Sequence, residues 1–337
     1  MKIVMTTVPF LPRVGGMETV VALLGRELVR LGCDVKVTTA IRAEQHDSFC
    51  YEVIRHPGVP DLLRLYGWAD VYLQHGPSLK FGWPVFLGSR KPSFIVHHIW
   101  MTEGGRNPVF ARWLRTSLLK RCRNLAVSNA VGKSLPVPWE AVPNPYDDKV
   151  FRMSLEIPRD RDLVFLGRLD RLKGADDLID ALGILKRNGY QVTLTIVGEG
   201  PMRELLEAKA RKLGLSDWID FAGERKPGEG LTSLLNRHKV LVVPSRWEEP
   251  FGIVALEGIA CGCVVIGSHG GGLPEAIGPC GITFPNGDAM TLASSIQTLL
   301  SRSGILEGYQ ANAKVHLAGH RPSAVARRYL QLLETAI

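Results

Sequence analysis

The chain alternates short apolar segments with amphipathic ones, and this alternation constrains its fold more than any other feature. The apolar segments are typical of strands buried in parallel sheets. We expect strands at 2–8, 34–40, 70–76, 93–98 and 124–130, and again at 162–169, 191–198, 218–223, 239–245 and 263–269. Helical periodicity between them is clearest at 16–32. The pattern predicts an α/β fold with two doubly wound, Rossmann-like sheets.

Prolines and charged residues interrupt this periodicity at 143–160, which predicts a domain boundary. We expect one Rossmann-like domain at 1–150 and a second at 151–318. The remaining segment, 319–337, has the pattern of an amphipathic helix, and we expect it to pack back on the N-terminal domain.

Charge and composition narrow the functional classes. Residues 1–150 contain 19 Lys and Arg against 12 Asp and Glu, whereas the rest of the chain is nearly neutral. An acidic partner is therefore expected at the first half. No apolar run approaches the roughly 20 residues of a membrane span. The N-terminus resembles a strand more than a signal peptide, and the six cysteines lack paired spacing, so a cytoplasmic location is expected.

Ligands of doubly wound sheets bind beyond the carboxyl ends of the strands, so the loops there are the candidate sites. Gly15 and Gly16 precede a helix whose N-terminus can receive an anion, although a Gly-Gly pair taken alone is more often a simple turn. Arg168 and Lys173 also lie between a strand and a helix. A guanidinium and an ammonium together suit a diphosphate, and solvated surface charges are the alternative.

Two acids frame the segment SRWEEPFGIVALEG, residues 245–258. Glu249 is expected in the loop after a strand, and Glu257 in the helix that follows. Carboxylates accept hydrogen bonds from vicinal hydroxyls, so one acid suits a sugar and the other a ribose. Exposed acids and a helix-face ion pair are the alternative.

These motifs together resemble those of the retaining glycosyltransferases of family 4, also called glycosyl transferases group 1. That family has the GT-B fold, in which two Rossmann-like domains face a central cleft, and uses nucleotide diphosphosugars. Glu249-Pro250-Phe251-Gly252 through Glu257 is similar to its E-x7-E motif. Further matches lie at 15–16, 167–174, 198–201 and 271–275, so the resemblance covers nearly the whole chain.

The resemblance implies a role for each matching residue. The diphosphate would contact Gly15, Gly16, Arg168 and Lys173; the sugar would contact Glu249, Phe251, Gly252 and His97; and the ribose and nucleotide would contact Glu257, Gly198, Ile253 and Val254. Glu249, His97, Arg168 and Lys173 would act in catalysis, the two cations by stabilising the leaving group. Because the family's mechanism is front-face, Glu249 is not assigned as a nucleophile.

The segment SFIVHHIWM ends a strand at His97 and His98. The family often has His followed by Asp at this point. His97 matches that histidine and is favoured over His98 for the sugar contact, and a buried structural histidine is the alternative. No Asp-x-Asp motif follows a strand, so we expect no metal and no cofactor besides the nucleotide sugar.

The resemblance thus implies a metal-independent transferase of a hexosyl or related group. It would move the sugar from a UDP- or GDP-sugar to a hydroxyl of a glycan, phosphorylated or lipid-linked acceptor, in polysaccharide or glycolipid biosynthesis. A nucleotide-sugar epimerase or hydrolase is the nearest alternative, and a dinucleotide-binding oxidoreductase is more remote because its glycine fingerprint is missing. No nucleic-acid-binding module is present in the sequence, and no nucleic-acid partner is expected.

The segment 107–124 has the pattern of a basic amphipathic helix. Phe110, Trp113, Leu114 and Leu118 fall on one side, surrounded by Arg112, Arg115, Lys120, Arg121 and Arg123. Helices of this composition lie on anionic lipid, so a peripheral contact with the inner face of the cell membrane is expected. A packed helix with solvated arginines is the alternative.

Overall fold

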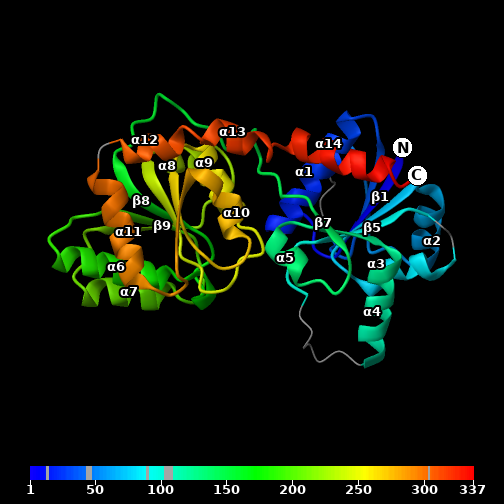
Figure 1. Ribbon diagram of the computed structural model, residues 1–337, viewed down its shortest axis with the longest axis horizontal. Coiled ribbons are helices and arrows are strands. Elements are labelled where there is room, and N and C mark those ends of the chain that lie inside the picture. The colour runs from blue at the N-terminus through cyan, green and yellow to red at the C-terminus, as the bar shows by residue number, and fades with distance from the viewer. Residues whose placement is uncertain (13–14, 43–47, 89–90, 102–108, 303) are drawn as a thin grey trace. The chain divides into compact units, whose positions relative to one another are not determined.

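The computed structural model describes residues 1–337 except 13–14, 43–47, 89–90, 102–108 and 303. The chain divides into two compact units. The first comprises Met1–Pro145 and His320–Ile337, and the second comprises Tyr146–Gly319. Each unit contains its own parallel sheet (Figure 1).

The sheet of the first unit has the strand order β3-β2-β1-β4-β5-β6-β7 in the residues described. Its strands are β1 Lys2–Thr7, β2 Asp34–Thr39, β3 Glu52–Arg55, β4 Val71–His75, β5 Ser93–His97, β6 Arg123–Ala126 and β7 Trp139–Ala141. Its helices are α1 Gly16–Arg30, α2 Val59–Trp68, α3 Leu79–Gly82, η1 Trp83–Phe86, α4 Val109–Arg121, α5 Asn129–Lys133 and α14 Pro322–Glu334. The last helix of the chain, α14, packs against the first, α1 (Figure 1).

The sheet of the second unit has the order β10-β9-β8-β11-β12-β13. Its strands are β8 Arg161–Leu166, β9 Leu194–Val197, β10 Ile219–Gly223, β11 His238–Val243, β12 Val264–Ser268 and β13 Gly281–Phe284. Its helices are η2 Arg171–Lys173, α6 Ala175–Arg187, α7 Arg203–Lys212, α8 Glu229–Asn236, α9 Ile253–Ala260, α10 Leu273–Ile277, η3 Gly278–Cys280, α11 Ala289–Ser301, α12 Ile305–Gln310 and α13 Ala313–Ala318.

Helices cover both faces of the second sheet, which explains why its strands read as continuous apolar runs. Val240 and Val242 of β11 are fully buried in a core shared with α6 and α11. Leu241 points to the opposite face. There it touches α9, because a Cβ added to Gly258 would lie 2.4 Å from its side chain. Because helices cover both faces, a ligand can approach the strands only at the edges of the sheet where they end.

The prediction of two doubly wound parallel sheets is confirmed. The alternation did not reveal the short strands β3, β7 and β13. The strand expected at 124–130 ends at Ala126, because Ser128 caps helix α5 by accepting a hydrogen bond from the backbone N–H of Val131 at 3.1 Å. Serine thus ends the strand and starts the helix within two residues.

Candidate functional site

The strand order of the second unit reverses at a topological switch point. From β8 the order runs to β9 and β10 in one direction, and from β11 it runs to β12 and β13 in the other. Ligands of such sheets bind beyond the carboxyl ends of the strands at this point. The loop after β8 carries Arg168 and Lys173, and the loop after β11 carries Glu249.

Lys173 and Glu249 meet at this edge, although 76 positions separate them in the chain. The Lys173 Nζ lies 2.6 Å from Glu249 Oε1. The buried hydroxyl of Ser245 donates to the same oxygen, also at 2.6 Å. In the described part of the chain, no side chain bonds to Glu249 Oε2. That second oxygen is therefore the one available to a hydroxyl of a ligand.

The close approach of the two loops depends on Gly174. Its backbone is left-handed, with a φ of 66°, and a Cβ there would lie 2.0 Å from the carbonyl oxygen of Pro244. Only glycine accepts both conditions without strain. The backbone of Glu249 is fixed from the other side, where its carbonyl accepts a hydrogen bond from Gly272 N at 2.7 Å.

Arg168 lies at the same edge but is not part of the ion pair between Lys173 and Glu249. Its side chain is 72% exposed, and its nearest acid is Asp170, with Nε 3.9 Å from Oδ2. The guanidinium therefore extends toward solvent, where an anionic ligand can reach it.

The other predicted residues of this unit follow β9 and β11. Gly198 directly follows β9, and its backbone packs against Gly167. Phe251 is buried, and Gly252 precedes the α9 residues Ile253 and Val254, which are partly buried. Glu257 is also in α9. Burial, with a further contribution from the charge of Asp147, raises the pKa of the Glu257 carboxyl to about 7.

In the first unit the strand order reverses between β1 and β4, which places the carboxyl end of β1 at its switch point. Gly15 is the N-cap of α1 and Gly16 is its first residue, so both lie at the helix N-terminus as expected. Sequence reasoning did not consider Glu18. A Cβ on Gly15 would lie 2.5 Å from the Glu18 carboxylate, so an acid already occupies the first turn.

The structure separates the two adjacent histidines. His97 Nε2 lies 3.0 Å from Asn124 Oδ1. Because the Asn124 amide donates to two backbone carbonyls, its oxygen is the acceptor and His97 carries the hydrogen on Nε2. His97 thus points toward the start of β6, and its predicted contact with the sugar stays a prediction.

His98 instead pairs with His75, the last residue of β4. The rings stack, and His75 Nδ1 lies 2.9 Å from His98 Nε2. In the described part of the chain the outer nitrogens, His75 Nε2 and His98 Nδ1, have no partner. Burial lowers the pKa of both rings, that of His98 to about 3; His98 adds to the shift of the His75 pKa, and His97 adds to that of the His98 pKa. The pair is therefore uncharged at neutral pH and lies at the ligand-binding edge.

The neutral pair predicts that acid destabilises the protein. Unfolded histidine has a pKa of about 6.5, so below that value the unfolded chain binds protons that the folded pair does not. The contribution of the pair to the free energy of unfolding is fully present above pH 6.5. It is lost as the pH falls toward the pKa values of the two histidines in the folded protein. We expect a loss of about 1 kcal/mol per pH unit for each histidine between pH 6 and 5. Urea unfolding at pH 7 and pH 5 should show a smaller decline in the His75→Gln/His98→Gln variant, and an equal decline would contradict the pairing.

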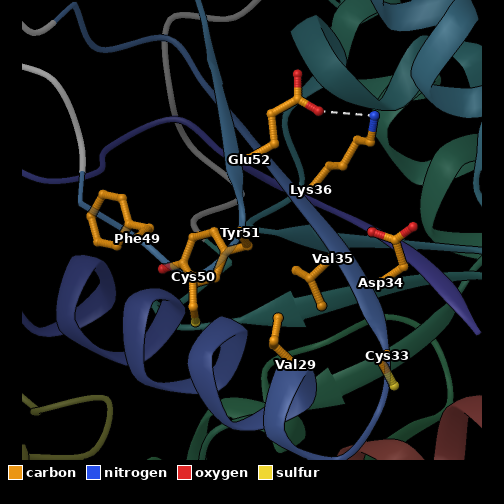
Figure 2. Close-up of a pocket in the computed structure, with 9 residues that line it drawn as sticks. All are labelled: Val29, Cys33, Asp34, Val35, Lys36, Phe49, Cys50, Tyr51 and Glu52. Atoms are coloured by element: carbon orange, nitrogen blue, oxygen red, sulfur yellow. Dashed lines mark ion pairs between the residues drawn. The ribbon is translucent and has the colours of Figure 1, made fainter.

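One cavity of the first unit lies away from these edges. A hollow of about 470 Å³ in the first unit is lined by Val29, Cys33, Asp34, Val35, Lys36, Phe49, Cys50, Tyr51 and Glu52 (Figure 2). An ion pair between Lys36 and Glu52, 2.9 Å long, links β2 to β3 there. Residues 33–36 lie at the amino end of β2, opposite to the edge where ligands of such sheets bind.

Among the described residues, no group of three or more His, Cys, Asp and Glu is arranged to hold a metal ion. Independence from metal remains a prediction. No helix within the described residues is both long and apolar enough to span a membrane.

Comparison with known families decides the affiliation of the chain. The profile of the family described as "Glycosyl transferases group 1" matches residues 147–316, which is just over half of the chain and nearly all of the second unit. The chain belongs to the glycosyl transferases group 1 family. The matched region contains Arg168, Lys173, Glu249 and Glu257 of this group 1 protein.

Two curated relatives of this group 1 protein each match about two fifths of its length. It is 39% identical over 141 residues to the glycogen synthase of Mycobacterium tuberculosis, which is 41% of this chain and 34% of that protein. It is 38% identical over 144 residues to the GDP-mannose-dependent alpha-(1-6)-phosphatidylinositol dimannoside mannosyltransferase of the same species, covering 42% and 35%. The chain thus spans about a third of the length of these relatives.

A solved structure extends the likeness of fold to the whole chain. HepE of Anabaena, in complex with UDP, superimposes with a TM-score of 0.82 at 20% sequence identity and covers 99% of this chain and 100% of its own. At this identity the likeness shows the fold alone, which is the two-domain GT-B fold.

Proposed function

We propose that this protein is a retaining glycosyltransferase that moves a sugar from a UDP- or GDP-sugar to a hydroxyl of a glycan or lipid-linked acceptor. The observation that carries the proposal is the meeting of Lys173 and Glu249 at the switch point of the second sheet. The Lys173 ammonium suits the diphosphate end of a nucleotide sugar, and the second carboxylate oxygen of Glu249 suits the hydroxyls at its sugar end. The neighbouring Arg168 adds a forked donor for the phosphates.

The chemistry follows from these charges. The acceptor hydroxyl attacks the anomeric carbon on the face from which the diphosphate leaves, and the bond between that carbon and the phosphate oxygen breaks. The hydroxyl proton passes to the departing diphosphate. Lys173 and Arg168 stabilise the negative charge that develops on the leaving group. Glu249 orients the sugar through Oε2, and Glu257 binds the ribose hydroxyls. No step requires a metal, and we place the reaction in the cytoplasm.

The relatives support both candidate nucleotides. HepE was solved with UDP, and the mycobacterial mannosyltransferase is named for its dependence on GDP-mannose.

The test is product analysis with UDP-, GDP-, ADP- and dTDP-sugars and no added metal, in the presence and absence of oligosaccharide and polyprenyl-phosphate-linked saccharide acceptors. We expect one donor to release its nucleoside diphosphate only when an acceptor is present. NMR of the product should show that the anomeric configuration is retained. An altered sugar without acceptor would indicate an epimerase, and free sugar would indicate a hydrolase. Inversion would overturn the front-face mechanism.

We further propose that helix α4 contacts anionic membrane. Phe110 and Trp113 are 68% and 62% exposed, and their rings stack with centroids 6.1 Å apart. Leu118, which was expected on the same apolar side, is instead buried in the core. Residues 107–108 of the predicted segment lie outside the described residues. An exposed aromatic pair flanked by Arg112 suits the interface of an anionic bilayer.

Charge reversal of α4 should therefore weaken membrane binding. Arg112→Glu/Arg121→Glu is expected to lower co-sedimentation with phosphatidylglycerol vesicles at least about fivefold, since each basic residue contributes about 1 kcal/mol near such a surface. The control is Arg211→Glu, which alters an exposed arginine of α7 in the second unit. Equal co-sedimentation of all three proteins would refute the contact.

A further inference from the structure

The loop that carries Glu249 is bonded to its neighbours by side chains outside the proposed ligand contacts. Arg246 is the first of them. Its Nε and Nη2 lie 2.7 and 2.5 Å from the two carboxylate oxygens of Asp177, and Nη2 also lies 2.7 Å from Asp176 Oδ2. The backbone N–H of Arg246 donates to the carbonyl of Leu172 at 2.8 Å. One residue thus joins the Glu249 loop to both sides of Lys173.

Asn286, which follows β13, makes the second connection. Its Oδ1 accepts a hydrogen bond from Gly270 N at 2.9 Å, and its Nδ2 donates to Ser245 O at 3.0 Å. The side chain therefore links the exits of β12 and β11. Ser245 in turn donates its hydroxyl to Glu249. The orientation of the Glu249 carboxylate depends on this chain of bonds.

The contacts of Arg246 exceed those of an ordinary surface ion pair. The Asp177 side chain is only 6% exposed, and the fork binds both of its oxygens. Bidentate, partly buried pairs of this kind fix geometry as well as contribute energy. The positive end of the α6 dipole favours acids in the first turn, which accounts for Asp176 and Asp177. It does not account for an arginine supplied by the Glu249 loop.

We infer that Arg246 and Asn286 are positioning residues, which hold the Glu249 carboxylate and the Lys173 ammonium in place for the donor sugar without touching it. The inference rests on the proposed transferase function for its kinetic consequence. That Arg246 and Asn286 hold the Glu249 loop rigid does not depend on the proposed function.

The experiment compares Arg246→Gln, Asn286→Asp and a matched control, Arg237→Gln. Arg237 makes the same two-pronged contact with Asp160, at 3.0 and 2.5 Å, but before β11 and β8, at the amino edge of the same sheet. Asp at position 286 preserves the shape and the acceptor for Gly270 but loses the donor to Ser245. Hydrogen exchange of peptides covering 245–252 and steady-state kinetics are measured for each folded variant.

We expect Arg246→Gln and Asn286→Asp to accelerate exchange in 245–252 at least tenfold, and Arg237→Gln to leave it within twofold. For the transferase reaction, both should lower kcat about 10- to 100-fold with less than threefold change in KM for the donor, because small misplacements of reacting groups cost this much. Adding Asp177→Asn to Arg246→Gln should cost little more, since the pair acts as a unit.

Exchange in 245–252 that is unchanged, or changed equally by Arg237→Gln, would overturn the positioning role. So would faster exchange with an unaltered kcat. Absence of transfer by the wild type with every donor would defeat the proposed function, and the exchange data would still decide whether Arg246 and Asn286 hold the loop.

Discussion

Replacement of Glu249 by glutamine is expected to lower the rate of sugar transfer about 100- to 1,000-fold, the range found when one preorganised electrostatic contact is removed from an active site. The amide keeps the shape of the side chain but removes the charge that orients Lys173 at 2.6 Å. It also weakens acceptance of donor hydroxyls at Oε2. The measurement is kcat for the donor that the wild type uses, together with the affinity for the corresponding nucleoside diphosphate.

Nucleoside diphosphate binding should change less than about threefold in this variant, because the proposed phosphate contacts are Arg168 and Lys173. Glu248→Gln is the matched control, since Glu248 is the adjacent acid and is exposed. It should retain activity within about twofold. A Glu249→Gln enzyme with near-normal kcat, or a Glu248→Gln enzyme with equal loss, would remove Glu249 from the proposed mechanism.

The Gly174→Ala substitution is expected to destabilise the second unit by about 2–4 kcal/mol. About 1–2 kcal/mol comes from a left-handed backbone at an L-residue, and the rest comes from the contact with the Pro244 carbonyl, 2.0 Å from the new methyl. Urea unfolding measures the loss. Because relief of the contact must separate the loops after β8 and β11, transfer by the folded fraction should also fall.

The Gly189→Ala substitution measures separately the part of the destabilisation that comes from the left-handed backbone. Gly189 has a φ of 79°, and a Cβ there would meet no atom within 4 Å. We expect a loss of about 1–2 kcal/mol from the left-handed conformation alone. If both substitutions cost the same, the close approach of Gly174 to Pro244 does not depend on the absence of a side chain at position 174.

The sequence was most informative where local pattern and topology act together. Continuous apolar runs identified ten strands, and the rule that loops at carboxyl ends bind ligands put Lys173 and Glu249 at the same edge. In the structure these two side chains are in direct contact. Short strands such as β13, with four residues, carry too little pattern to stand out from a loop.

The supporting residues were not predicted, because their partners are distant in the chain. Arg246 bonds to Asp177 across 69 positions, and Asn286 bonds to Ser245 across 41. Nothing local distinguishes such an arginine or asparagine from a solvated one. His75 was missed for a related reason. Nothing in the sequence distinguishes a histidine at the end of a strand, and only its contact with the ring of His98 does so.

The most direct test of a sugar-nucleotide site in the second unit is calorimetric titration with UDP, GDP, ADP and dTDP without added metal. The wild type is compared with Arg168→Gln/Lys173→Gln and with Arg171→Gln, which alters the exposed arginine between them in sequence. The site predicts that one nucleoside diphosphate binds the wild type and the Arg171 variant equally. The double variant should bind it at least about 100-fold more weakly, since two charged hydrogen bonds are lost. Binding that is absent from the wild type, or unchanged in the double variant, would contradict the assignment of this edge as the donor site.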